Sequence, residues 1–240
     1  MATGDDRPLG EKLDYLPPNV WPDGRMLYGA SVVLQKLDMN VHGEDLWQAF
    51  SVDEKGAIWD YLPYGPFASR SGLDECYGQL GACGDPLFYA IVPNSSGRAE
   101  GVASYLNIVP ANGTIEIGHI NLAPSLQRTY EATEALFLMM RHAMDDLGNR
   151  RLEWKCNANN AASCRAAERL GFTFEGVFRQ HIVVKGRNRD SAWFSIIDKE
   201  WPGLREAYFA WLKPENFSRE GKQKKALSKL TKAALKAIGN

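Results

Sequence analysis

Apolar and polar residues repeat with two different periods along the chain, and the period separates strands from helices. Alternation with period two predicts strands at residues 27–34, 87–92, 101–109, 114–122, 152–156, 173–185 and 191–197. Apolar residues three and four positions apart predict helices at residues 44–50, 69–80, 131–147 and 160–170. The chain therefore reads β-α-α-β-β-β-α-β-α-β-β.

The connections between these elements indicate how the strands pair. Asn112-Gly113 joins the strands 101–109 and 114–122, and Asn-Gly suits a hairpin turn with positive φ, so these strands should be antiparallel neighbours. The strand 114–122, the helix 131–147 and the strand 152–156 form a unit of the kind that makes parallel pairs. The order predicts an α/β or α+β fold with one mixed, strongly twisted central sheet flanked by helices.

The two ends of the chain differ from this middle part. Residues 1–25 contain Pro8, Pro17, Pro18 and Pro22, which suits an extended arm before a single domain at 26–212. Residues 213–240 form a basic tail, whose lysines and leucines follow a helical spacing. Such a helix either docks on its own domain, the reading we favour, or binds an acidic partner such as phospholipid, RNA or an acidic protein.

Composition narrows the function classes. A chain of 240 residues with 45% hydrophobic residues can bury one substantial core. A net charge of −1 argues against a protein that coats nucleic acid with its whole surface, which leaves only the tail for such a partner. The four cysteines match neither a zinc site nor a CxxC redox motif, so we expect reduced thiols and no metal.

The N-terminus and the apolar runs of the chain indicate where the protein is located. The N-terminus is acidic and lacks an apolar signal region, and no apolar run approaches the length of a membrane span. We expect the cytoplasm, with the nucleus as the alternative, and a monomer or homodimer.

The junction between the strand 114–122 and the helix 131–147 is a candidate anion site. Residues 127–133 read Q-R-T-Y-E-A-T. Backbone N–H groups at such a turn lack intrahelical partners, and the helix dipole adds positive potential there. The pyrophosphate of an acyl-carrying cofactor is one anion that this turn would accept.

Four short motifs give the chain a family resemblance: E-I-G-H at 116–119, the turn at 127–132, N-A-A-S at 160–163 and G-F-x-x-E-G-x-x-R at 171–179. With them the chain resembles the GNAT superfamily of N-acetyltransferases over about residues 26–201, and most closely the RimJ/RimL branch. The resemblance implies a GNAT-like fold and acetyl-CoA as co-substrate. It also implies acetyl transfer to a primary amine by direct attack in a ternary complex.

The resemblance assigns the pyrophosphate to the turn, which in the family has the form Q/R-x-x-G-x-G/A. Gln127 and Ala132 take its first and last positions, and Tyr130 replaces the first glycine, which tolerates more backbone angles. The implied cofactor contacts are Gln127, Arg128, Thr129, Tyr130, Glu131, Ala132 and Thr133, with Asn160 and Ser163 from the later helix.

Acetyl transfer needs a base, a site for the carbonyl oxygen and a proton for the leaving thiolate. Glu116 and His119 are the candidate bases, but a regular strand points them to opposite faces unless a bulge intervenes. For the oxygen, the resemblance implies backbone N–H groups where the strand splays from its neighbour, at Ile120, Asn121 or Leu122.

The proton donor and the acceptor site would come from other segments of the chain. Many members place a tyrosine where this chain has Ala167, whereas the RimL-like branch has a serine at the position of Ser163. That branch also carries an acidic residue where Ile182 stands, and the neighbouring His181 is an alternative base. The acceptor wall falls on the aromatic loop 59–67, whose candidate contacts are Trp59, Tyr61, Tyr64 and Phe67. Arg187, Arg189 and Asp190 of the later hairpin lie opposite.

The acceptor itself is a small-molecule amine or the N-terminus of a protein or peptide. Two other functions stay open at this point. Tyr130 and Ala167 depart from the family pattern, which suits a module that binds CoA without turnover. The basic tail suits an adaptor for acidic partners.

Overall fold

The computed structural model describes residues 10–219 and 221–239. One open, mixed sheet crosses this part of the chain, with the strand order β1-β2-β3-β4-β5-β6-β8-β7. The strands are β1 Leu27–Tyr28, β2 Val32–Lys36, β3 Leu87–Pro93, β4 Gly101–Val109, β5 Thr114–Leu122, β6 Arg151–Asn157, β7 Thr173–Val184 and β8 Arg187–Ile197. The predicted α/β fold with a mixed central sheet is confirmed.

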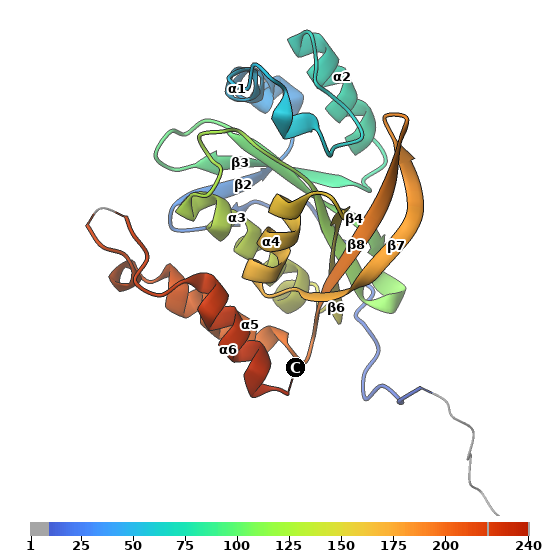
Figure 1. Ribbon diagram of the computed structural model, residues 1–240, viewed down its shortest axis with the longest axis vertical. Helices are drawn as coiled ribbons and strands as arrows, with labels where there is room; N and C mark the ends of the chain where they lie inside the picture. The colour runs from blue at the N-terminus through green and yellow to red at the C-terminus, as the bar shows by residue number, and fades with distance from the viewer. Residues whose placement is uncertain (1–9, 220, 240) are drawn as a thin grey trace, which may run out of the picture.

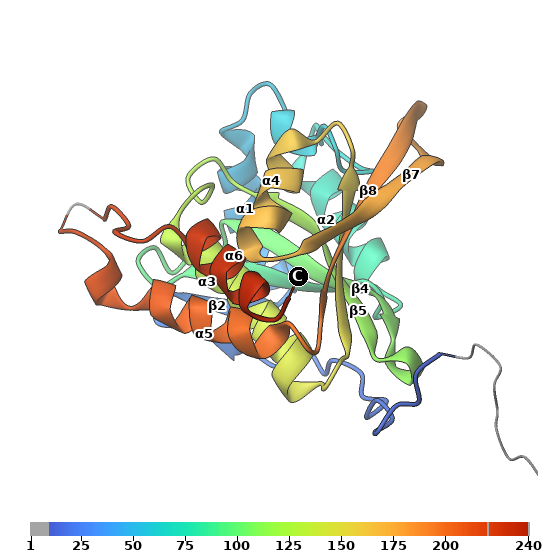
Figure 2. The same ribbon diagram turned by 60° about the horizontal axis from the view of Figure 1, so that its bottom comes forward.

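Helices cover both faces of the sheet (Figures 1 and 2). They are α1 Met39–Ser51, α2 Arg70–Gly81, α3 Tyr130–Arg141, α4 Ala161–Leu170, α5 Trp201–Leu212 and α6 Leu227–Ala237. Short turns of helix are η1 Ala57–Trp59, η2 Pro110–Asn112, the π-helical η3 His142–Asp146 and η4 Pro214–Asn216. The helices α1 and α2 pack on one face, and the helices from α3 onward pack on the other.

The predicted pairings around the middle of the sheet are confirmed. β4 and β5 are antiparallel, and Gly113 in the turn between them has a φ of 62°. β5 and β6 are parallel, joined through α3. Their register contains only three pairs, Thr114↔Arg151, Ile115↔Leu152 and Glu116↔Glu153. Beyond Glu116 the two strands therefore diverge, and this divergence places a wedge-shaped opening at the centre of the sheet.

The prediction of one continuous strand at residues 27–34 is wrong. The segment splits into β1 and β2 because the backbone turns between them, and Glu134 of α3 stabilises that turn. The Glu134 carboxylate accepts hydrogen bonds from Ala30 N at 2.8 Å, Ser31 N at 2.8 Å and Ser31 Oγ at 2.6 Å. The next helix starts at Met39 rather than residue 44, since the Asp38 side chain accepts a bond from Asn40 N and caps it.

The sequence pattern did not predict α5. Four large side chains of this helix are buried, Trp201, Leu204, Tyr208 and Trp211. They lie three or four residues apart, and Pro202 occupies the first turn, which is a favourable position for proline. Tyr208 stacks on Phe137 at a ring distance of 4.6 Å, so α5 packs directly on α3.

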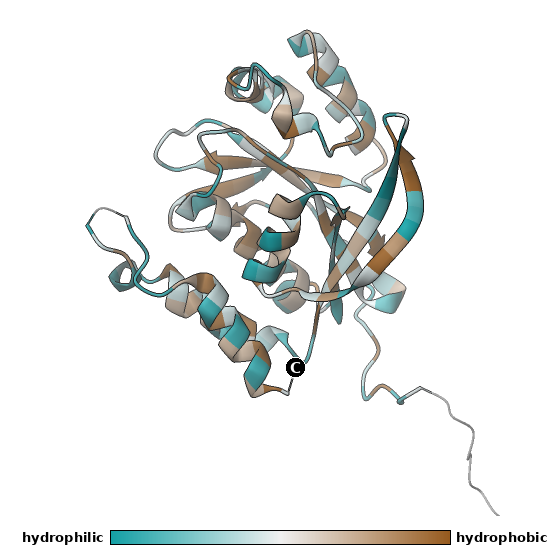
Figure 3. Ribbon diagram, viewed as in Figure 1, coloured by the Kyte–Doolittle hydropathy of each residue, from teal (hydrophilic) through white to brown (hydrophobic). Residues whose placement is uncertain are grey.

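The basic tail helix α6 docks on the domain, as the favoured reading predicted. Leu227 and Thr231 are buried, and Thr231 Oγ1 donates to the carbonyl of Arg169 at the end of α4. The lysines Lys229, Lys232 and Lys236 are exposed. Figure 3 shows the resulting bands of hydrophilic and hydrophobic residues around α6. None of the helices within the described ranges is long and apolar enough for a membrane span.

Candidate active site

A bulge in β5 brings both predicted bases to one face of the sheet. His119 has a φ of 48°, and the pairing with β4 jumps from Ser104↔Gly118 to Val102↔Asn121. Two residues of β5, His119 and Ile120, thus oppose one residue of β4, which reverses the alternation beyond this point. The face shared by Glu116 and His119 is opposite to the one packed against α3; we call it the acceptor face.

Glu116 is buried at the mouth of the divergence between β5 and β6. The residue is only 4% exposed. Oε2 accepts a hydrogen bond of 2.6 Å from Asn107 Nδ2 and forms an ion pair of 2.8 Å with Lys155 Nζ. Oε1 accepts no hydrogen bond from the described residues. Burial raises the pKa of Glu116, and the contacts with Lys155 and Asn107 oppose this increase only in part. One carboxylate oxygen is thus held while the other is available.

Lys155 connects Glu116 to a row of charges along β6. Its ammonium also contacts Glu153 at 2.7 Å and lies 4.1 Å from the ring centre of Trp193. Burial alone would lower the pKa of Lys155, but the ion pairs with the two carboxylates outweigh it and raise the pKa. The lysine therefore stays charged and fixes the orientation of Glu116.

His119 lies among aromatic rings on the same face. Its ring stacks on Tyr64 at a centroid distance of 5.6 Å, and Nδ1 is 3.1 Å from the Tyr64 hydroxyl. Burial, with a smaller contribution from the charge of Arg189, lowers the pKa of His119 to about 4. The imidazole is therefore neutral near pH 7 and too weakly basic to compete with a carboxylate for a proton from an amine.

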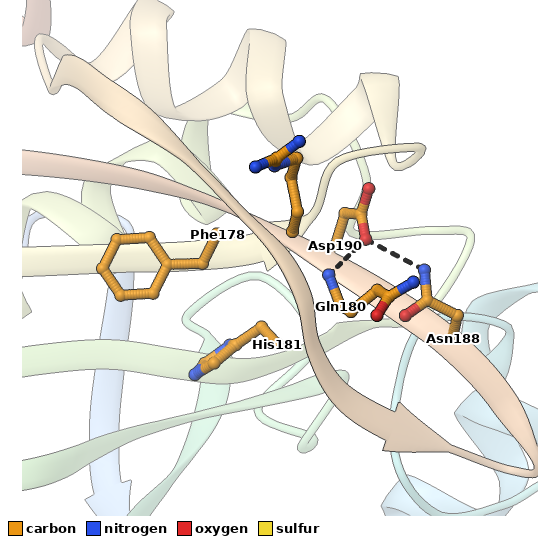
Figure 4. A pocket seen from close by; sticks show the side chains of 6 residues that line it. Phe178, Gln180, His181, Asn188 and Asp190 are labelled. Atoms are coloured by element: carbon orange, nitrogen blue, oxygen red, sulfur yellow. Dashed lines mark hydrogen bonds between the residues drawn. The ribbon is translucent and has the colours of Figure 1, made fainter.

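The third candidate base, His181, lies on the β7–β8 hairpin (Figure 4). Its Nδ1 is 2.9 Å from Ser191 Oγ, and its ring is near Phe178 and Trp193. Asp190, a predicted acceptor contact, instead accepts hydrogen bonds from Gln180 N at 2.7 Å and Asn188 Nδ2 at 2.9 Å. Gln180 has a φ of 51° inside a β7 bulge, so the Asp190 carboxylate stabilises that bulge.

The predicted anion turn has an irregular backbone. Arg128 has a φ of 63°, and Thr129 then caps α3, with Oγ1 accepting from Ala132 N at 3.1 Å. Gln127 is tied back to the end of β5 through a bond from Nε2 to Leu122 O. Glu131 and Thr133 lie in the first turn of the helix. The positive φ falls on Arg128 and not on Tyr130, whose backbone is helical.

Tyr130, which replaces the family glycine, points away from the turn. Its ring stacks on Trp211 at 5.5 Å and meets Phe217 edge-on at 5.1 Å. Its hydroxyl donates to the carbonyl of Leu212 at 2.8 Å. The tyrosine thus joins α3 to the C-terminal segment, and its side chain contacts that segment rather than the turn.

The start of α4 faces the same divergence. Asn160 caps this helix, because its Oδ1 accepts from Ser163 N at 3.0 Å. Ser163 Oγ accepts from Trp154 Nε1 at 3.0 Å, and the Ser163 hydroxyl also acts on the neighbouring Cys156, where it partly opposes the rise in thiol pKa that burial causes. The four cysteines are free thiols, and the sulfurs of Cys156 and Cys164 are 3.5 Å apart beside Ser163.

The aromatic loop divides between core and surface. Trp59 is only 4% exposed and packs edge-on against Phe50 and Phe67, so its side chain belongs to the core under α1 and α2. Tyr61 is 41% exposed, and its hydroxyl donates to the carbonyl of Asn159 at 3.2 Å. Among the aromatic candidates, Tyr64 is the one that contacts a predicted base directly.

Comparison with known proteins decides the family. A family model described as an acetyltransferase (GNAT) domain matches residues 40–173. The chain belongs to the GNAT acetyltransferase family. A GCN5-related N-acetyltransferase from Brucella melitensis is 45% identical, with a TM-score of 0.87 over 91% of this chain and 99% of that one.

Two further structures extend this result. A probable GNAT-family acetyltransferase from Chromobacterium violaceum is 40% identical, with a TM-score of 0.74 over 82% of this chain and 99% of that one. RimL, a ribosomal L7/L12 alpha-N-protein acetyltransferase, is 25% identical, with a TM-score of 0.62 over 72% of this chain and 94% of that one. The likeness to RimL agrees with the RimJ/RimL-like branch.

Sequence reasoning missed two members of the site in this GNAT protein, Lys155 and Asn107. The sequence pattern could have indicated Lys155, because Arg151, Glu153 and Lys155 alternate with apolar residues in a strand at the centre of the sheet. Charges on one face of a central strand usually serve a network. No sequence pattern indicated Asn107, because its contact with Glu116 depends on the φ of 48° that Asn107 itself adopts near the end of β4.

Proposed function

We propose that this GNAT protein transfers an acetyl group from acetyl-CoA to a primary amine by direct attack in a ternary complex. The observation that carries the proposal is the divergence of β5 and β6 beyond Glu116. It gives an extended thioester carrier a path between the strands. A buried carboxylate with one available oxygen lies where that path opens onto the acceptor face.

The residues present fit acetyl-CoA. The N–H groups from Arg128 to Glu131 at the start of α3 suit a pyrophosphate, whereas that of Ala132 donates to Thr129 Oγ1, and Arg128 adds an exposed positive charge. Ala132 is small, and Tyr130 is turned away, so neither side chain covers the turn. Ile120, Asn121 and Leu122 would line the carrier's pantetheine arm along the edge of β5 that β6 leaves. When bound, acetyl-CoA supplies the activated acetyl group.

Three groups of this chain would perform the proton and charge transfers. Glu116 Oε1 accepts a proton from the ammonium form of the acceptor, directly or through a water molecule, and so produces a neutral amine. Backbone N–H groups of the β5 bulge stabilise negative charge on the carbonyl oxygen. The Ser163 hydroxyl, held by Trp154, donates a hydrogen bond to the departing sulfur.

Neither rival function gains support from the structure. The departure at Tyr130 suggested a CoA-binding module without turnover, but its side chain packs on the C-terminal segment, away from the turn. The adaptor reading needed a free amphipathic helix, whereas the apolar face of α6 is docked on α4 and α5. We expect the enzyme to act on amines in the cytoplasm.

The direct test is mass spectrometry of products after the purified protein has been incubated with acetyl-CoA and a defined set of amines and peptides. The proposal predicts free CoA together with at least one acceptor that has gained an acetyl group on nitrogen. Binding of acetyl-CoA in calorimetry without any acetylated product would instead favour the binding module.

A further inference from the structure

We propose that the acceptor is a compact amine that also carries a carboxylate, and that Arg189 of β8 binds this carboxylate. The inference rests on the proposed acetyl transfer and names the class of acceptor that this site would select. It depends on the position of Arg189, on its lack of an anionic partner and on the segments that enclose it.

Arg189 lies on the acceptor face near both predicted bases. Residues of β8 alternate between faces, so Arg189 shares its face with Ser191 and Trp193, the neighbours of His181 and Lys155. Its positive charge lowers the pKa of His119, and the Glu116 carboxylate acts on the guanidinium in turn. An anion bound to Arg189 would therefore lie within electrostatic reach of Glu116.

Arg189 differs from Lys155 and Arg151, the two cations of the neighbouring strand β6, in having no counter-charge. Lys155 contacts two carboxylates, Glu116 and Glu153, and Arg151 also contacts two, Glu153 and Glu175. The described part of the chain provides Arg189 with neither an ion pair nor a side-chain hydrogen bond, although its Nε is buried. A buried donor without an acceptor costs free energy, which a bound ligand would recover.

The chemistry of guanidinium favours a carboxylate as the missing partner. Its planar fork donates two parallel hydrogen bonds to a carboxylate, and partial burial strengthens such a pair. The pyrophosphate of the acyl carrier is not the partner, because its proposed turn lies at the start of α3, on the α3 side of the sheet. The ligand of Arg189 therefore belongs to the acceptor.

Three contacts link the segments around this position into a ring. Lys185 Nζ at the hairpin tip donates to Trp59 O at 2.8 Å, and Tyr61 OH donates to Asn159 O at 3.2 Å. Ala158 N, beside Asn159, donates to the carbonyl of Asp190 at 2.8 Å. The aromatic loop, the β6–α4 loop and the hairpin thus hold one another, which favours a compact acceptor over a folded protein surface.

The test compares acceptors that differ only in the carboxylate. Initial rates of thiol release would be measured with the full chain, acetyl-CoA and each standard amino acid, its carboxamide and its decarboxylated amine, corrected for the fraction of neutral amine. A third arm uses peptides with a free N-terminus. We expect kcat/KM for the best amino acid to exceed that of its uncharged counterparts and of peptides by about tenfold or more.

Variants then assign the effect to Arg189. Arg189→Gln should reduce kcat/KM for the carboxylate-bearing acceptor by about 30-fold, mainly through KM, and leave the uncharged counterpart within about twofold. Arg189→Lys keeps the charge but loses the planar fork of guanidinium, so its kcat/KM for the carboxylate-bearing acceptor should lie between those of the wild type and Arg189→Gln. Arg179→Gln removes an exposed charge from the neighbouring strand and should match the wild type. Melting temperature and acetyl-CoA affinity verify folding of each variant.

The outcomes separate this inference from the function on which it rests. Equal rates for acids and uncharged amines, better rates for peptides, or an equal loss on all acceptors in both Arg189 variants would overturn the role of Arg189 while acetyl transfer stands. Acetyl-CoA that is bound but never consumed with any acceptor would overturn the proposed function and this inference together.

Discussion

A single positive φ at His119 places two side chains, His119 and Glu116, on one face of β5. The residue types for this site could be predicted from the sequence, because Glu116 and His119 belong to a family motif. Their common direction could not be predicted, since a bulge depends on the pairing of two strands and leaves no trace in the period of the residues. The contact of Asn107 with Glu116 was unpredictable for a similar reason, since it depends on a positive φ at Asn107, whereas the alternating charges of β6 do indicate Lys155.

The buried imidazole of His119 should make folding depend on pH. Its folded-state pKa of about 4 lies below the unfolded value of 6.5. The stabilising contribution is thus complete above pH 6.5 and is lost as pH falls toward 4. It amounts to at most about 2 to 3 kcal/mol. Asn tolerates positive φ, so His119→Asn is a suitable comparison.

Urea unfolding of both proteins between pH 4 and 7.5 measures this effect. The difference in unfolding free energy between wild type and His119→Asn should shrink as the pH is lowered. Only the wild type has an imidazole at this position, and the unfolded chain protonates it at pH values where the folded protein keeps it neutral. A difference that is constant over this pH range would show that His119 titrates normally in the folded protein.

At the scale of single elements, the turn before α3 shows how a replaced glycine is accommodated. The sequence predicted the turn, but it indicated neither the cap at Thr129 nor a partner for the ring of Tyr130. That partner, the pair Trp211 and Phe217, belongs to α5 and the segment after it. Because the sequence did not predict α5, the packing of Tyr130 on Trp211 could not be predicted either.

Restoring the family glycine should therefore harm this protein. Tyr130→Gly removes two ring contacts and a hydrogen bond and adds backbone freedom, and should reduce the unfolding free energy by about 3 kcal/mol. Tyr130→Phe loses only the hydroxyl bond to Leu212 and should cost about 1 kcal/mol. Chemical denaturation of the two variants measures these values.

The affinity for acetyl-CoA gives the matching control. Tyr130→Phe should bind acetyl-CoA as tightly as the wild type, because the hydroxyl points away from the turn. A Tyr130→Gly protein as stable as the wild type would contradict the packing described here.

At the scale of the whole molecule, the sheet and its order follow from the sequence, and the C-terminal region follows only in part. Alternating strands and the hairpin and crossover connections predicted the mixed sheet. The amphipathic pattern of α6 also predicted docking, but not the site of docking. That site is a surface formed jointly by α4 and α5, where Gly203 lets the Ala234 side chain approach closely.

The docked tail predicts different results from two kinds of substitution. Leu227 is 1% exposed, so Leu227→Ala should lower the unfolding free energy by about 2 to 4 kcal/mol. Lys232→Gln removes an exposed charge from the same helix and should change the unfolding free energy by less than about 0.5 kcal/mol. Thermal or chemical unfolding compares the two. Similar stabilities for both variants would mean that the helix is free in solution.

The central claim is that Glu116 serves as the base for acetyl transfer at the mouth of the divergence between β5 and β6. The most direct measurement is the pH dependence of kcat/KM for wild type and Glu116→Gln, using an acceptor of low amine pKa so that its own protonation does not obscure the acid limb. Activity of the wild type should fall as pH drops through the raised pKa of Glu116. The variant should lack this limb and be slower by about 10²- to 10³-fold at neutral pH. An unchanged profile and rate in Glu116→Gln, with acetyl-CoA still bound, would contradict the account.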